Sequence, residues 1–150
     1  IGLKQPVRPQ KGQILVTQKI DKLIEVPMTL LRQTAEGSIM IGDSKEEVGF
    51  DISSSIDIMA QIADRARRTL PVLEKQQIIR GWAALRVMSP DGFPMYDQSE
   101  SCPGGFAITC HSGVTLAAAH CFDMAADIEV GNLGVGLQAF TERRFDVSTH

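Results

Sequence analysis

Cysteine is scarce in this sequence, basic residues do not outnumber acidic ones, and there is no long apolar run. Three cysteines without a framework spacing argue against a disulfide scaffold and favour free thiols in a reducing compartment. The formal net charge of −3 gives no basic field for nucleic acid. No apolar run approaches the roughly 20 residues that a membrane helix requires. We therefore expect a cytoplasmic protein without a membrane span or a nucleic-acid partner, with attachment to the inner membrane through partner proteins as an alternative.

The glycine-rich loop that binds a dinucleotide is also missing. No Gly-x-Gly-x-x-Gly motif follows a strand, and the glycines of residues 131–136 have the wrong spacing for it. No signal-like segment is present, and residue 1 is isoleucine. A length of 150 residues with 43% hydrophobic content is enough to form a core. We expect a single domain over residues 1–150.

The hydrophobic pattern predicts an α+β fold with a mainly antiparallel sheet of hairpins and two principal helices. The helices are expected at about 53–70 and 113–128. In the first, apolar residues recur at three- and four-residue spacing, Ser54 with Asp57 suggests a capping box, and Pro71 follows its end. The strands are expected at 13–16, 28–34, 38–42, 78–88, 93–96 and 106–110.

Two segments in the second half of the chain carry the clearest chemical signal. In residues 81–94 an arginine, Arg86, lies on an apolar strand and a Ser-Pro-Asp-Gly turn follows. In residues 105–116 a second apolar strand runs into a glycine and a helix. A guanidinium binds a carboxylate with two parallel hydrogen bonds, and a helix N-terminus favours negative charge. The pattern indicates a site for a flat, electron-poor ligand, with a structural arginine and a plain strand-to-helix turn as the alternatives.

These segments resemble the C-terminal part of FAD-dependent amine and amino-acid oxidoreductases of the D-amino-acid oxidase class. Residues 8–17 are similar to the Arg-Gly-Gln strand of that family, and residues 31–44 to its hairpin that ends in a Gly-x-Ser/Thr turn. The most similar members are glycine oxidase, sarcosine oxidase β chains, and the β subunits of opine and hydroxyproline dehydrogenases, the last group favoured by residues 111–116. The resemblance implies a substrate-binding, C-terminal part of a longer flavoenzyme, without its N-terminal dinucleotide-binding part.

The resemblance also implies an activity. It implies oxidation of the C–N bond of a small amino acid, imino acid or opine by hydride transfer to flavin, alongside other redox subunits of a hetero-oligomer. No cysteine precedes Ser89-Pro90, where some sarcosine oxidases attach FAD covalently. We expect non-covalent FAD in the full-length enzyme and none on the isolated chain. The alternative is a non-catalytic binding or subunit-interaction domain that shares the same sheet.

The resemblance assigns site residues without fixing a catalytic one. Arg86 is expected to bind the substrate carboxylate, and Tyr96 to line the substrate pocket or the core. For His111 a core position is the alternative to a place beside the cofactor. The expected cofactor-binding residues are Asp91, Gly92, Pro94, His111, Ser112, Gly113, Val114, Thr115 and Leu116.

Three further features have simpler explanations. The pairs Cys110-His111 and His120-Cys121 lie at opposite ends of one expected helix, roughly 14 Å apart at 1.5 Å per residue. Metal ligands must converge within a few ångströms, so we reject a metal site there. Trp82 is expected in the core, and the basic cluster at 65–68 on the solvated face of its helix.

Overall fold

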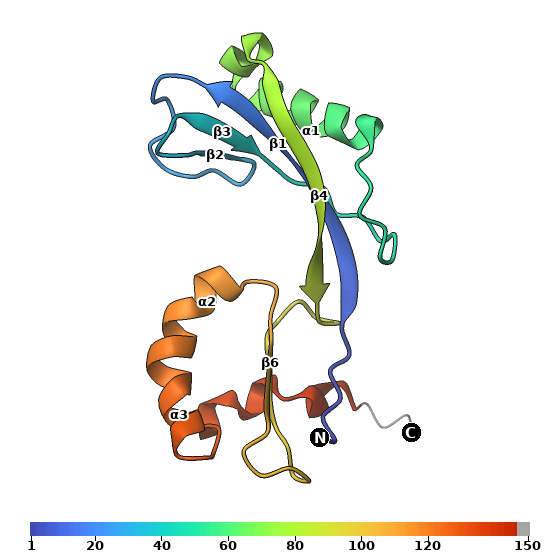
Figure 1. Cartoon of the computed structure of the whole chain (residues 1–150), viewed down its shortest axis with the longest axis vertical. Helices are drawn as coiled ribbons and strands as arrows, with labels where there is room; N and C mark the ends of the chain where they lie inside the picture. Colours follow the sequence, from blue (N-terminus) through green and yellow to red (C-terminus); the bar gives the residue numbers. More distant parts are fainter. Residues whose placement is uncertain (147–150) are drawn as a thin grey trace. The chain divides into compact units, whose positions relative to one another are not determined.

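The computed structural model describes residues 1–146, which form two compact units (Figure 1). The sheet unit comprises Pro9–Arg86, and the helical unit comprises Ile1–Arg8 together with the chain from Val87 onward. The expectation of a single domain stays a prediction. The fold class is confirmed as α+β, with antiparallel strand pairing and helices at both expected positions.

A four-stranded sheet with the order β2-β3-β1-β4 is the frame of the sheet unit. Its strands are β1 (Arg8–Lys19), β2 (Leu31–Gln33), β3 (Ser38–Ile41) and β4 (Ile78–Met88). The expected hairpin is confirmed, because β2 and β3 pair antiparallel around Gly37, which takes a φ of +101°. β1 is much longer than expected, because its partly polar ends also join the sheet.

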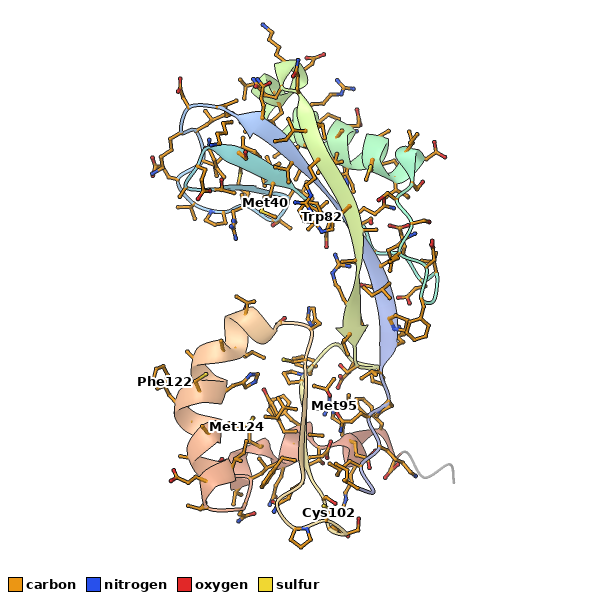
Figure 2. All side chains as sticks on the ribbon, viewed as in Figure 1. Met40, Trp82, Met95, Cys102, Phe122 and Met124 are labelled. Atoms are coloured by element: carbon orange, nitrogen blue, oxygen red, sulfur yellow. The ribbon has the colours of Figure 1, made fainter. Side chains whose placement is uncertain are left out.

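Helix α1 (Ile56–Thr69) covers one side of this sheet (Figure 1). Its Ile62 and Ala66 join a core with Leu31 and Ile39 of β2 and β3, which explains the apolar spacing of the sequence. The expected capping box is wrong: the N-cap is Ser55, and no side chain caps the helix. The expectation for Trp82 is also wrong, since it is only half-buried on β4 (Figure 2).

The helical unit combines a short hairpin with one long helical run. β5 (Met95–Gln98) and β6 (Phe106–Thr109) pair antiparallel. The run consists of α2 (Gly113–Ala119), a π-helical turn (His120–Met124) and α3 (Ala125–Glu129), followed by 3-10 turns at Val135–Phe140 and Glu142–Phe145.

Side chains of the helical run separate into two faces. Met124 is buried, and in the hairpin Met95 is buried as well, whereas Phe122 points outward and is 81% exposed (Figure 2). Within residues 1–146, no helix combines the length and the apolar character needed to cross a bilayer.

Candidate functional site

The turn between β4 and β5 is fixed by its own side chains and by the C-terminal segment. Asp91 accepts a hydrogen bond from the Phe93 N–H at 3.0 Å. Arg144 donates to both carboxylate oxygens of Asp91: its Nε lies 2.8 Å from Oδ2, and its Nη2 lies 3.0 Å from Oδ1. The bonds from Arg144 are the main reason that the pKa of Asp91 falls to about 2. The Asp91 carboxylate therefore holds the turn that carries Gly92, whose φ is +79°.

This pair gives a prediction about acid stability. The pKa of Asp91 is about 2 in the folded state, below its ordinary value of 3.8, so the pair stabilises the fold fully above about pH 4 and progressively less as the pH falls toward 2. Asp91→Asn should therefore lower Tm most above pH 4, and the difference from wild type should shrink between pH 4 and 2. Thermal unfolding across this range is the measurement. Arg144→Met should behave in the same way, and a pH-independent difference in both variants would contradict the assignment.

A pocket of about 570 Å³ lies between the turn, the hairpin and the start of the helical run. Most of the expected site residues meet here, although they come from two segments of the sequence. The lining residues are Gly92, Phe93, Pro94, Tyr96, His111, Ser112, Thr115, Leu116, Leu137 and Phe140. Phe93, Leu137 and Phe140 were not expected at the site. The only signal for the last two is a short apolar patch in an otherwise featureless tail.

Tyr96 forms the polar centre of the wall of this pocket. Its ring is buried, and its hydroxyl lies 2.9 Å from Nε2 of His120. The rings of His120 and Phe140 meet it edge-on, with centroids at 5.6 and 6.0 Å. Burial raises the pKa of Tyr96, so the phenol is neutral near pH 7. Among residues 1–146, no cluster of His, Cys, Asp and Glu could hold a metal ion.

The start of the helical run is open around Gly113. Among residues 1–146, a Cβ at Gly113 would meet only Sγ of Cys110, at 3.8 Å, and Gly113 is not among the glycines with positive φ. Ser112 provides no side-chain cap for the first turn. His111 is exposed at the pocket, so the alternative of a core histidine is wrong. Val114 is 96% exposed and does not line the pocket.

Arg86 lies at the end of the sheet unit, where several acceptors surround its guanidinium. Nη2 lies 2.7 Å from Oδ2 of Asp43, and Nη1 donates to the Ser44 carbonyl at 3.0 Å. A weaker contact of 3.5 Å joins Nη1 to Oε1 of Gln10. The Arg86 side chain remains 25% exposed. The partner Asp43 was missed, because a single aspartate beside a turn has no distinctive sequence signal.

A buried polar network fixes the segment that holds Arg86. The Gln13 backbone N–H donates to Oγ of Ser44 at 2.9 Å, and this hydroxyl in turn donates to Glu46. Lys11, only 3% exposed, places Nζ 2.8 Å from Asp51 and 3.4 Å from Glu46. The hydrogen bond from Lys11 is the main reason that the pKa of Asp51 falls to about 2. The loop after β3 is thereby tied to β1 by charge-assisted hydrogen bonds.

Comparisons with known proteins identify a family and several similar chains. Residues 1–126 match the family model described as FAD dependent oxidoreductase. The chain is 47% identical over 145 residues to an opine oxidase subunit of Agrobacterium tumefaciens, and the match covers 97% of this chain and 39% of that protein. It is 29% identical over 130 residues to glycine oxidase of Pseudomonas putida, covering 81% of this chain and 35% of that protein.

The fold comparison covers nearly the whole chain. The crystal structure of L-proline dehydrogenase from P. horikoshii matches with a TM-score of 0.83 at 24% identity, over 97% of this chain and 42% of that one. The glycine oxidase of Bacillus cereus matches with a TM-score of 0.77 at 24% identity, over 87% of this chain and 38% of that one. The chain thus spans about two fifths of the length of these relatives.

Proposed function

Because the chain belongs to the family of FAD-dependent oxidoreductases, we propose that it is the substrate-side part of a longer enzyme that oxidises the C–N bond of a small amino acid, imino acid or opine. The observation that carries this proposal is the pocket in which residues 92–96 meet residues 111–116. The identity of 47% with one chain of an opine oxidase supports an opine or a related amino acid as the substrate. The name of that relative describes one part of a larger assembly, which supports further redox subunits as partners.

The residues of the pocket fit a flavin ring. Its volume of about 570 Å³ lies in the range of about 300–1,000 Å³ that is typical of cofactor sites. Phe93, Leu116 and Phe140 offer apolar surface to a flat ring, and the first N–H groups of the helical run have no side-chain cap. Gly92, Pro94, His111, Ser112 and Thr115 would hold the ring without a covalent bond. When bound, FAD supplies the hydride acceptor.

The side chains of this chain then have separate tasks. Arg86 binds the carboxylate of the substrate and orients the neighbouring C–N bond. The neutral phenol of Tyr96, held by His120, donates or accepts a hydrogen bond without acting as a base near pH 7. Asp91 does not touch the ligand in this proposal; through Arg144 it holds the turn that carries Gly92 and Pro94.

Arg86→Lys tests the role of the arginine in the full-length enzyme. Lysine keeps the charge but loses the planar pair of donors, so we expect KM for a carboxylate substrate to rise by about tenfold while Tm changes little. Arg80→Lys is the control, because Arg80 also lies on β4 but stacks over Trp82, with 5.1 Å between the guanidinium carbon and the ring centroid. Steady-state kinetics decide, and a kcat/KM within about twofold of wild type for Arg86→Lys would remove Arg86 from the site.

A further inference from the structure

We propose that Asp43 is a specificity-determining residue that makes the Arg86 site select ligands with an amino group next to the carboxylate. Plain carboxylates, including a 2-oxo acid product, are then bound less well. This inference rests on the proposed function, because it takes Arg86 as the carboxylate site.

The geometry leaves room for a second carboxylate beside Asp43. Arg86 uses Nη2 for Oδ2 of Asp43 and Nη1 for the Ser44 carbonyl. A guanidinium has five N–H donors, and within residues 1–146 no hydrogen bond of Nε is found. Both partners can be reached by a ligand, since their side chains are 25% and 40% exposed. A carboxylate at the remaining donors lies next to the Asp43 carboxylate.

The charges of this arrangement discriminate between ligands. Arg86 and Asp43 together carry no net charge, so a ligand with only a carboxylate meets one cation and one anion at similar range. A ligand with a protonated amino group next to its carboxylate offers a positive charge to Asp43 and offsets the repulsion between the two carboxylates. An amino acid, an imino acid and an opine all have this arrangement.

The discrimination also separates substrate from product. With FAD bound, oxidation of the C–N bond would transfer a hydride from the carbon to the cofactor and release a proton from the nitrogen, which leaves an imine. Water would then add to the imine carbon, the nitrogen would leave as ammonia or as the free amine half of an opine, and a 2-oxo acid would remain. The resulting 2-oxo acid keeps the carboxylate but has lost the amino group that Asp43 would contact. The 2-oxo acid is therefore released from a site that continues to accept the amine substrate.

Asp43 is held in place by its neighbour in the chain. Ser44 is buried, and its side chain bonds to the Gln13 N–H and to Glu46. The backbone next to Asp43 is thus tied to β1, which keeps the Asp43 carboxylate beside Arg86. A surface ion pair without such support would separate at small cost.

The test uses the full-length holoenzyme and its best substrate in a panel of amino acids, imino acids and opines. Propionate and pyruvate serve as competitive inhibitors, because they carry a carboxylate without an amino group. For Asp43→Asn we expect the ratio of their Ki values to the KM of the amine substrate to fall by about tenfold or more, because loss of the Asp43 charge weakens binding of the ammonium group and relieves repulsion of a plain carboxylate. Asp43→Glu keeps the charge and should retain most of the discrimination, and it serves if Asp43→Asn does not fold.

Arg86→Met separates failure of this inference from failure of the proposed function. If Arg86→Met raises KM and weakens both inhibitors, while Asp43→Asn leaves the ratio within about twofold, Asp43 does not set specificity but Arg86 still binds the carboxylate. If Arg86→Met changes neither KM nor inhibition, both proposals fall. If the ratio of inhibitor Ki to substrate KM falls in Asp43→Asn and stays at the wild-type value in Asp43→Glu, the selection of amines by Asp43 is supported.

Discussion

Replacing Gly12 by alanine is expected to raise KM for the carboxylate substrate by about tenfold or more, with little loss of thermal stability. A Cβ at Gly12 would lie 2.4 Å from Nη2 and 2.7 Å from Cζ of Arg86. Such distances are impossible, so the guanidinium must move. It is the far end of a flexible side chain, and it can leave its site at small cost to the fold. The substitution therefore changes the orientation of Arg86 relative to a ligand more than it changes the stability of the fold.

Gly81→Ala is the matched control for this result. Gly81 lies on β4, the strand of Arg86, and its added Cβ would meet Cε of Met59 at 2.7 Å and Cδ2 of Leu15 at 3.1 Å. These are packing contacts against the core, so the cost should appear as a lower Tm with an unchanged KM. Kinetics and thermal unfolding of both variants are the measurements. A Gly12→Ala enzyme with normal KM would show that the position of Arg86 is irrelevant to substrate binding.

The fold was predictable where the sequence pattern is local. The spacing of apolar residues gave the range of α1, and the β-branched and apolar run of 78–88 gave β4. The capping box failed because Ser55, at the N-cap, uses its backbone N–H for Oε1 of Gln13, a partner 42 residues away. The sequence contains no local signal for a contact of that kind.

The candidate site residues were likewise predictable where a local motif marks them and not predictable elsewhere. The residues of 92–96 and 111–116 were foreseen through short motifs with a known order, and the pocket brings most of them together. Asp43 was missed beside Arg86 in the sheet unit, and Arg144 and Phe140 were missed around the turn and the pocket of the helical unit, because each comes from a segment without a motif of its own. Arg86 pairs with Asp43 across 43 residues, and Arg144 pairs with Asp91 across 53. Such pairs depend on the tertiary fold, and the periodicity of the sequence carries no information about them.

Gly113→Val should give a folded enzyme that has lost its flavin. Gly113 has an ordinary φ, and within residues 1–146 an added Cβ would meet only Sγ of Cys110, at 3.8 Å, apart from its own neighbours and helix backbone. The backbone at residue 113 therefore accepts a Cβ without conformational strain. A loss of flavin without a fall in Tm would therefore come from a ligand that occupies the open space. We expect the ratio of flavin to protein, read from the yellow absorbance, to fall severely while Tm of the apoprotein is preserved.

Gly136→Val is the control for this experiment. Gly136 also has an ordinary φ, and within residues 1–146 nothing lies within 4 Å of its added Cβ. Neither glycine lines the pocket itself, but Gly113 lies between the lining residues Ser112 and Thr115 in the first turn of α2, whereas Gly136 lies in the 3-10 turn of Val135–Phe140. A valine there should leave the flavin content at the wild-type level, so a loss specific to Gly113 locates the ring beside the start of the helical run. If Gly113→Val keeps a normal flavin ratio, the ring does not approach residue 113, and the first turn of α2 has to be given up as a flavin contact.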